Sequence, residues 1–344
     1  MVAPTGTALS EENPLATDEP IYDIAHLGHV ELLTPDLEGS AAFFTEVYGL
    51  FLEAETTDSI YLRAQHDHDR TTLKLTAATQ PGLGHLGWRT TSPHALARRV
   101  QALHDSGVDG AWINGDIGHG RAFRFRSLGG HLTEIYFESE RFVAGPGQAP
   151  FLPNQPQRFQ PHGAAAARLD HINLLVHDVA AEREFLREVL GFKLRERLVP
   201  ARQQLELGAW LSVLTKSHDL ALTREHTTAT GRLHHLAYAV DTPQDVLRAA
   251  DVFLDNGTHI EFGPAKHSRT QGLFLYVLEP GGNRVEIFTG GLQIYAPDWE
   301  AVTWDTESNG RSTAWGLAVP DTFHTYATPP VAVPERPASA AATY

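Results

Sequence analysis

The sequence contains no cysteine. This absence excludes disulfide bonds, thiolate metal ligands and cysteine nucleophiles, so any chemistry must come from histidine, carboxylates, tyrosine or a bound metal ion. Long apolar runs are also missing: no apolar stretch approaches the roughly 18 residues typical of a membrane-spanning helix. The N-terminal residues lack the basic start and the apolar core of a secretion signal. We therefore expect a soluble cytoplasmic protein.

Basic residues are scarce. Lys and Arg number 27 against 42 Asp and Glu, which gives a formal net charge of -15. Nucleic acids and anionic membrane surfaces are bound through clustered Lys and Arg, which this sequence lacks. The 344 residues, 42% of them apolar and 20% charged, have the composition of a globular protein long enough for two domains. We expect a small-molecule ligand, with no nucleic-acid or membrane partner.

Histidine, by contrast, is plentiful at 19 residues, and its placement reveals an internal duplication. Three segments of the first half align with three of the second: 29–49 with 171–191, 85–107 with 235–257, and 129–135 with 281–287. The offset between partners grows from 142 to 150 and then 152, as small loop insertions would produce. The chain is therefore predicted to contain two related halves.

Pro-rich and polar segments mark the boundaries of these halves. We predict a mobile N-terminal arm (1–20), an N-terminal domain (21–144), a linker (145–165), a C-terminal catalytic domain (166–295), a C-terminal extension packing near the active site (296–328) and a disordered tail (329–344).

Within the second half the pattern is a strand, a helix and then further strands. We predict strands at 171–176, 210–214, 219–223 and 235–240, helices at 178–190 and 243–256, and a closing hairpin of 272–278 with 284–289. Two such β-rich units in each half would curl a sheet around a cleft.

Three strand-like runs each carry one side chain that can bind a metal ion, namely His171, His235 and Glu286. Strand alternation can point all three into one concave interior. A lone carboxylate among apolar neighbours, as at Glu286, is costly unless it is neutralised or coordinated. For any one of them a hydrogen-bonded histidine or a salt-bridged glutamate is the simpler interpretation. Together they indicate a two-histidine, one-carboxylate site, which leaves open metal positions and suits Fe(II) or Mn(II).

At this point the sequence resembles a known family, the type I extradiol ring-cleaving dioxygenases of the vicinal oxygen chelate superfamily, which includes catechol 2,3-dioxygenase and homoprotocatechuate 2,3-dioxygenase. The most specific motif is Leu-Tyr-Val-Leu-Glu-Pro-Gly-Gly-Asn-Arg-Val-Glu-Ile at 275–287, and the resemblance covers roughly 21–326. It implies an α+β fold of tandem paired βαβββ modules, the glyoxalase-like fold, with two domains that each curl a sheet around a cleft. It also implies that the metal ligands are His171, His235 and Glu286, with His234 in a supporting role.

The resemblance implies further roles. The family's acid-base histidine falls on His218, a second active-site histidine on His267, and the tyrosine beside the substrate oxygens on Tyr276. Asn173 matches a polar residue near the dioxygen position, and Trp210 an aromatic wall. The implied activity is Fe(II)-dependent cleavage of a catechol beside its two hydroxyls, giving a hydroxymuconic semialdehyde-type product in aromatic compound catabolism. The implied assembly is a homo-oligomer such as a tetramer.

Two positions bear on the substrate. Phe262 stands where homoprotocatechuate-type enzymes place an arginine for the substrate carboxylate, and Arg311 matches a second such arginine. A single surface arginine is more often solvated than part of a clamp. We therefore expect a neutral, alkyl-substituted or aryl-substituted catechol.

The first half keeps His29, His85 and Glu134 at the positions equivalent to the C-terminal ligands. A second metal site could form there, but Thr71 and Arg124 stand at the positions equivalent to His218 and Tyr276, so we expect a remnant or a structural role rather than catalysis. Two other functions fit the same fold: a metal-dependent glyoxalase or isomerase, and a non-catalytic ligand-binding protein.

Overall fold

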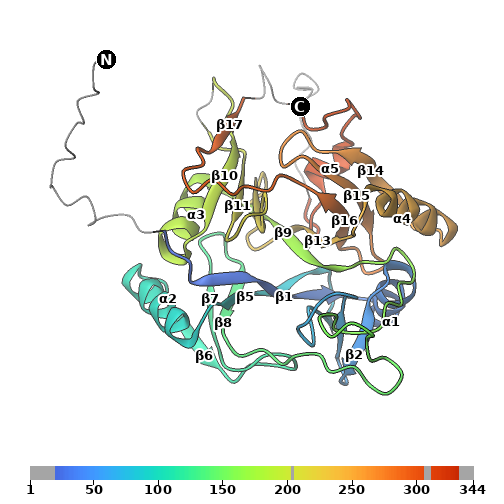
Figure 1. Cartoon of the computed structure of the whole chain (residues 1–344). Coiled ribbons are helices and arrows are strands. Elements are labelled where there is room, and N and C mark those ends of the chain that lie inside the picture. Colours follow the sequence, from blue (N-terminus) through green and yellow to red (C-terminus); the bar gives the residue numbers. More distant parts are fainter. Residues whose placement is uncertain (1–19, 203–204, 306–310, 333–344) are drawn as a thin grey trace, which may run out of the picture.

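Two large mixed sheets, one from each half of the chain, build the molecule (Figure 1). The structure is a computed structural model that describes residues 20–202, 205–305 and 311–332. Few helices accompany the strands, and the predicted α+β fold with paired βαβββ modules is confirmed. The expected N-terminal arm and C-terminal tail fall almost entirely outside the described residues.

The first sheet uses the strands of the N-terminal half in the order β2-β3-β4-β1-β5-β8-β7-β6. The elements of this half are β1 (Ile24–Thr34), α1 (Leu37–Ala42), η1 (Phe43–Tyr48), β2 (Phe51–Glu55), β3 (Ser59–Arg63), β4 (Leu73–Ala77), β5 (Gly82–Thr90), α2 (Pro93–Asp105), β6 (Gly110–Ile113), β7 (Ala122–Arg126) and β8 (Leu132–Tyr136).

The second sheet has the order β14-β15-β16-β13-β9-β12-β11-β10-β17. Its half comprises β9 (Arg168–Val176), α3 (Val179–Phe185), η2 (Leu186–Leu190), β10 (Lys193–Leu198), β11 (Gly208–Ser212), β12 (Leu220–Arg224), β13 (Leu233–Ala239), α4 (Pro243–Asp255), β14 (Ile260–Lys266), β15 (Gly272–Leu278) and β16 (Arg284–Gly290), followed by β17 (Val302–Trp304) and α5 (Asp321–Thr325).

The two sheets repeat one design. In each half a strand, a helix and three strands occur twice, and the leading strands of the two modules pair antiparallel at the centre, β1 with β5 and β9 with β13. The last strand of each module returns parallel to its leading strand, as β16 does to β13. This arrangement brings the leading and last strands of the modules to the middle of the sheet, which is where the predicted metal ligands lie.

The helix predicted at 178–190 is present but changes type along its length. It begins with Asp178, whose carboxylate accepts a hydrogen bond from the Ala181 amide, and its second part is the π-helical segment η2. It ends at Gly191, whose φ of 83° is a left-handed conformation that glycine adopts without strain. Gly49, with a φ of 96°, ends η1 in the same way.

The two halves pack through aromatic side chains and buried hydrogen bonds. The Phe43 and Phe253 rings stack at 6.1 Å, and the Trp88 and Phe192 rings meet edge-on at 4.8 Å. The Tyr48 hydroxyl donates to the backbone carbonyl of Glu286 at 2.6 Å. The N-terminal half thus supports the strand that carries a predicted metal ligand.

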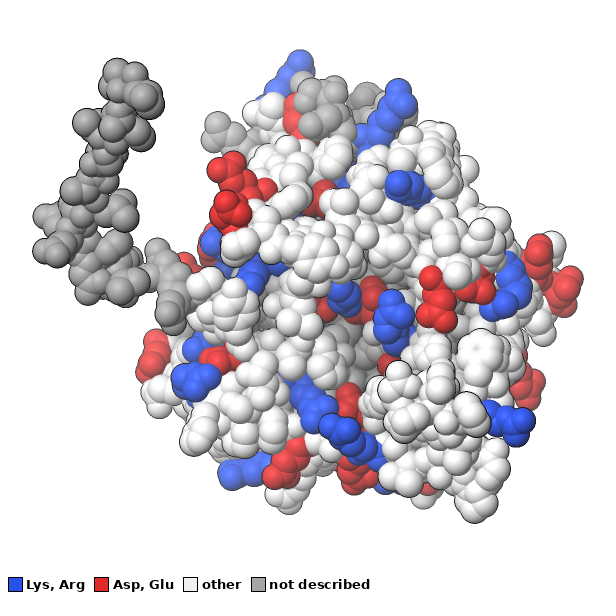
Figure 2. Space-filling model, in the orientation of Figure 1, with Lys and Arg blue, Asp and Glu red and all other residues white. Residues whose placement is uncertain are grey.

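The segment after β16 folds back over the C-terminal sheet (Figure 1). β17 pairs parallel with β10, and α5 packs against β14 through the Phe323 ring, which lies 5.0 Å from the ring of Phe262. On the face seen in Figure 2, acidic and basic side chains are interspersed with uncharged ones. Among the described residues, no helix has the length and apolar character needed to cross a membrane.

Candidate metal centre and active site

Three adjacent strands present the predicted ligands on one face. His171 of β9 and Glu286 of β16 both lie opposite Ala237, the residue between them on β13. His235 precedes Ala237 by two positions, so it points to the same face of the sheet. One nitrogen or oxygen atom from each of the three side chains lies within 4.8 Å of the others, and all three side chains are buried.

The two histidines direct Nε2 at the same carboxylate oxygen. His171 Nε2 lies 3.0 Å and His235 Nε2 lies 3.1 Å from Glu286 Oε2. On the far side of the first ring, His171 Nδ1 donates to Asp170 Oδ2 at 2.8 Å. Second partners of this kind fix the tautomer and the orientation of metal-binding histidines.

His234 fixes the second ring. Its Nε2 donates to the backbone carbonyl of Phe323 at 2.8 Å, which leaves its Nδ1 to accept a hydrogen bond from His235 Nδ1 at 2.7 Å. Burial lowers the pKa of His235 to about 4, so the ring is neutral. The His235 Nε2 lone pair therefore faces the carboxylate of Glu286. A cation bound between these two atoms would satisfy both of them.

Glu286 also shows that a metal ion fits. Burial acts to raise its pKa, but the charge of His171 and the surrounding imidazoles hold the pKa well below the usual range of a glutamate. Its Oε1 is buried and has no hydrogen-bond partner within the described part of the chain. An unsatisfied carboxylate oxygen beside two fixed imidazoles is the donor set that Fe(II) and Mn(II) accept.

A cavity of about 360 Å³ opens in front of this cluster. That volume is in the range of small-molecule sites and exceeds the needs of a single six-membered ring. Its lining includes all of the predicted catalytic residues and three of the predicted pocket residues: Asn173, Trp210, His218, Phe262, His267 and Tyr276.

His218 lies against the first ligand. Its ring centroid is 4.0 Å from that of His171, and its Nδ1 is 3.0 Å from the Ser217 hydroxyl. Burial, with repulsion from His171, lowers the pKa of His218 well below its ordinary value. The ring is therefore neutral and able to exchange a proton with a bound molecule.

Tyr276 and His267 form a pair on the opposite wall. The Tyr276 hydroxyl is 3.1 Å from His267 Nε2, which itself lies 3.6 Å from Glu286 Oε1. Burial raises the pKa of Tyr276 well above its ordinary value, so the phenol keeps its proton. Burial lowers the pKa of His267. Both are neutral hydrogen-bonding groups at the metal site.

The remaining predicted residues divide into two groups. The Asn173 amide oxygen accepts from the Thr223 hydroxyl at 3.0 Å, and Phe262 lies parallel to Tyr276 with 6.1 Å between ring centroids. Arg311, however, is exposed and is not among the residues that line the cavity, although its neighbour Ser312 is.

Arg269 and Phe323 are among the lining residues that sequence reasoning missed. Arg269 places its guanidinium 5.2 Å from the Trp210 ring, and its Nη1 is buried with no hydrogen-bond partner in residues 20–202, 205–305 and 311–332. Burial lowers the pKa of Arg269 to about 10, which still leaves it cationic at neutral pH. Phe323 reaches the cavity from the C-terminal extension. No sequence pattern identifies Phe323, whereas Arg269 could have been found from its place two residues after His267.

A smaller cluster occupies the equivalent place in the N-terminal half. Besides His29, His85 and Glu134, it contains His119, which the alignment of the two halves did not identify. His119 lies 15 residues before Glu134, but His267 lies 19 before Glu286, and this shift hid the correspondence.

Comparison with known proteins adds the family. The profile of the Glyoxalase/Bleomycin resistance protein/Dioxygenase superfamily matches residues 26–135 and 168–287. Metapyrocatechase of Geobacillus stearothermophilus is 43% identical over 314 residues, covering 90% of this chain and 95% of the relative. The manganese-dependent 2,3-dihydroxybiphenyl 1,2-dioxygenase of Geobacillus genomosp. 3 is 35% identical over 85% of this chain and 94% of its own length.

Solved structures support the same family. Homoprotocatechuate 2,3-dioxygenase from Brevibacterium fuscum, in its anaerobic complex with 3,4-dihydroxyphenylacetate, superposes with a TM-score of 0.79 at 27% identity, covering 91% of this chain and 94% of that one. The 2,3-dioxygenase LapB from Pseudomonas sp. KL28 gives a TM-score of 0.76 at 29% identity, over 83% of this chain and 98% of that one.

Proposed function

The chain belongs to the Glyoxalase/Bleomycin resistance protein/Dioxygenase superfamily and is an extradiol ring-cleaving dioxygenase within it, and from this premise we propose how its residues share the reaction. The observation that carries the proposal is the convergence of two oriented imidazoles on a buried carboxylate with an unsatisfied oxygen. The isomerase and ligand-binding alternatives give way, because a metapyrocatechase aligns over 90% of this chain.

His171, His235 and Glu286 would hold the Fe(II) or Mn(II) ion. When bound, such an ion lowers the pKa of catechol hydroxyls and offers open positions where substrate and dioxygen meet. Asp170 and His234 act through the ligands, because each fixes the Nδ1 proton of one histidine and thereby turns its Nε2 lone pair inward.

His218 would move the proton of one catechol hydroxyl. Its ring is neutral, and the Ser217 hydroxyl can occupy Nδ1, which leaves Nε2 for the substrate side. A neutral imidazole beside the metal site accepts a proton from a hydroxyl and returns it later to a product oxygen.

Tyr276 and His267 would orient the substrate. The protonated phenol can donate to a catechol oxygen while His267 Nε2 holds the phenol in place at 3.1 Å. Asn173, 7% exposed, lines the same cavity, and its amide would lie near the dioxygen, as the family resemblance implies. These groups bind and orient, and they shield the reacting atoms from bulk water.

The apolar walls support a catechol with an uncharged substituent. Leu198, Leu205, Leu207, Trp210 and Phe262 line the cavity together with Phe323. A neutral alkyl or aryl group gains from burial against such side chains. The volume beyond a single ring leaves room for that group.

One observation supports a second candidate, a catechol with an acidic substituent. Arg269 Nη1 is buried and unpartnered at the cavity, and a carboxylate would satisfy it. The two candidates differ in how they depend on this one side chain.

A substrate panel tests both proposals. Anaerobically Fe(II)-loaded protein receives catechol, 3- and 4-methylcatechol, 2,3-dihydroxybiphenyl and 3,4-dihydroxyphenylacetate, and oxygen uptake gives kcat/KM for each. We expect the neutral substrates to lead and the Arg269→Gln variant to keep their order. If 3,4-dihydroxyphenylacetate leads, and Arg269→Gln reduces its kcat/KM at least about 10-fold while the exposed control Arg311→Gln does not, the acidic candidate replaces the neutral one. A loss in Arg311→Gln instead would assign the anchor to that residue.

The domain boundaries at 21–144 and 166–295 and the cytoplasmic location are proposals that rest on the sequence patterns described above. The homo-oligomeric assembly is a proposal that rests on the resemblance to the dioxygenase family.

A further inference from the structure

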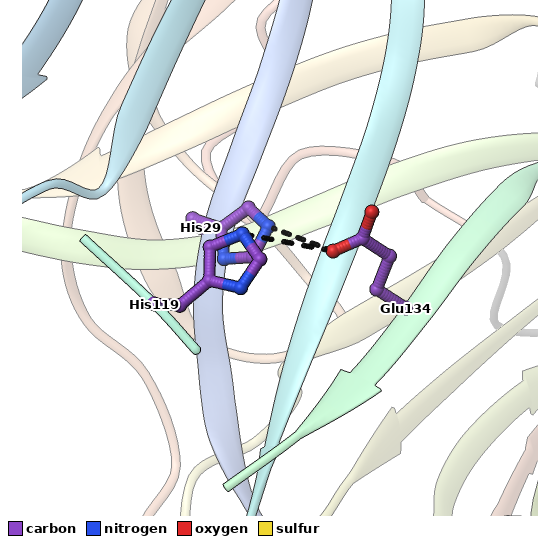
Figure 3. A group of neighbouring side chains, drawn as sticks. All are labelled: His29, His119 and Glu134. Carbon is purple, nitrogen blue, oxygen red and sulfur yellow. Dashed lines mark ion pairs between the residues drawn. The ribbon is translucent and has the colours of Figure 1, made fainter. Parts of the chain in front are cut away.

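We propose that the N-terminal half binds a second divalent transition-metal ion of the zinc type, in a closed structural site. The ligands are His29 of β1, His85 of β5, Glu134 of β8 and His119 of the loop between β6 and β7. Figure 3 shows three of them, His29, His119 and Glu134, directed toward one another. This inference does not depend on the reaction proposed for the C-terminal half.

Three of the ligand residues already lie close enough to share one ion, because one atom each of His29, His119 and Glu134 lies within 4.8 Å of the others. His29 Nε2 and His85 Nε2 are 3.1 Å apart. Both His29 Nε2 and His119 Nε2 lie 3.7 Å from Glu134 Oε2, and His85 Nε2 lies 3.7 Å from Oε1. Zinc bonds of 2.0–2.1 Å in a tetrahedron would separate the ligand atoms by about 3.3 Å. Shifts of a few tenths of an ångström would therefore bring His29, His119 and Glu134 onto one ion, and His85, which now faces Oε1, would turn toward Oε2 to complete the coordination.

The protons of two rings already point away from the proposed ion. His85 Nδ1 donates to Glu31 Oε2 at 2.7 Å, and His119 Nδ1 donates to the Gly120 carbonyl at 3.0 Å. With the proton on Nδ1, Nε2 is the nitrogen left to bind an ion, and in both rings it faces Glu134. Carboxylate and carbonyl partners on the outer nitrogen are the usual support of metal-binding histidines.

Two buried atoms at the centre have no partner without an ion. Among the residues that the structure describes, nothing forms a hydrogen bond with His119 Nε2 or Glu134 Oε2, although His119 is only 7% exposed and Glu134 is fully buried. Arg124 pairs with the other oxygen, Oε1, and so neutralises part of the carboxylate charge without occupying Oε2. A buried acceptor pair of this kind is costly, and a cation satisfies both atoms at once.

The site is closed by protein, unlike the one in the C-terminal half. The His119 ring stacks on His29 at 4.4 Å and lies 4.9 Å from the Tyr136 ring. Thr71, at the position equivalent to His218, donates its hydroxyl to the Ile117 carbonyl at 3.0 Å, within the loop that carries His119. Four protein ligands with no open position are typical of structural zinc. The ion would fasten this loop to β1, β5 and β8.

Metal stoichiometry tests the proposal on the full chain. The protein is stripped with a chelator, reloaded with Zn(II), freed of excess metal by gel filtration and measured by inductively coupled plasma mass spectrometry. We expect two ions per chain in the parent protein, one in His119→Ala, one in the double variant His171→Ala/His235→Ala, and none in the triple variant. Loading the double variant with Co(II) should give the strong visible bands of four-coordinate cobalt rather than the weak bands of six-coordinate cobalt.

One ion per chain in the parent protein, with none in His171→Ala/His235→Ala, would overturn the proposal. An unchanged count of two ions per chain in both single variants, His119→Ala and Glu134→Gln, would also overturn the proposal. Should His119→Ala fail to fold, the double variant decides alone, because it leaves the N-terminal ligands intact. Oxygen uptake by Fe(II)-loaded parent protein, measured in parallel, reports the C-terminal reaction independently of the ion count.

Discussion

Replacing Asp170 by asparagine should weaken metal binding without removing any ligand. Asp170 is 5% exposed, and its Oδ2 accepts the Nδ1 proton of His171 at 2.8 Å. Its Oδ1 lies 3.4 Å from Lys216 Nζ. Burial acts to raise the pKa of Asp170, but Lys216 and His171 hold it well below the usual range. The carboxylate is therefore ionised, and its charge makes His171 a stronger electron donor.

The size of the effect follows from what asparagine keeps. Changes in the partners of metal ligands typically cost 10- to 100-fold in affinity, which is about 1.4–2.7 kcal/mol. In the Asp170→Asn variant the amide would still offer an oxygen to His171 Nδ1, so the geometry survives and only the charge is lost. We expect the lower end of the range, about 10-fold.

The assay is competition for Fe(II) or Mn(II) between the protein and a chromogenic chelator at fixed pH. Asp178→Asn serves as the matched control, because Asp178 caps α3 at an exposed position and asparagine caps helices equally well. We expect unchanged affinity in the control and unchanged kcat in both variants at saturating metal. Equal affinities of Asp170→Asn and the parent protein would refute the assigned role of His171 and its partner.

Three further predictions concern pH, orientation and the contact between halves. Burial lowers the pKa of His131 from 6.5 to about 4, so between these values the unfolded chain binds a proton that the folded chain does not. Stability should therefore fall by up to about 3 kcal/mol as the pH drops across this window; urea unfolding of His131→Gln should show a shallower fall, and equal slopes would contradict this. Tyr276→Phe should lower kcat/KM by about 10- to 100-fold at unchanged metal content, since it removes the hydroxyl that contacts His267 and would contact the substrate but leaves the metal ligands intact; a loss of metal would instead mean that Tyr276 supports the ligands. Tyr48→Phe removes the 2.6 Å hydrogen bond to the backbone carbonyl of Glu286 and should lower the free energy of unfolding by about 1–2 kcal/mol. An unchanged melting temperature would contradict this prediction.

Strand and helix positions were well predicted where the pattern was strong. The strand 272–278 is β15, and the helix predicted at 243–256 is α4, which ends one residue earlier. β14 was not predicted, because Gly263 and Pro264 interrupt a run that otherwise alternates. The pairing of β14 with β15 outweighs this local interruption, and the register between the two strands is irregular at Phe262.

Prediction of the candidate site from sequence meets the same limit, because it depends on local patterns. Residues with metal-binding side chains on central strands, such as His171 and Glu286, follow from alternation once the duplication is seen. His119 and Phe323 could not be predicted in this way. His119 lies in a loop and Phe323 in the C-terminal extension, and tertiary packing that brings them to their sites produces no periodic pattern in the sequence. Contacts of this kind depend on the folded arrangement of both halves.

The most direct test of the central claim compares the parent protein with Glu286→Gln, each loaded with Fe(II) under anaerobic conditions and then given catechol and oxygen. Iron content, oxygen uptake and near-visible absorbance of the product are measured on the same samples. We predict that the parent protein consumes one oxygen per catechol and forms a hydroxymuconic semialdehyde-type product, whereas folded Glu286→Gln loses bound iron and turnover together. Ring cleavage at the parental rate by Glu286→Gln would contradict the assignment of the metal to His171, His235 and Glu286.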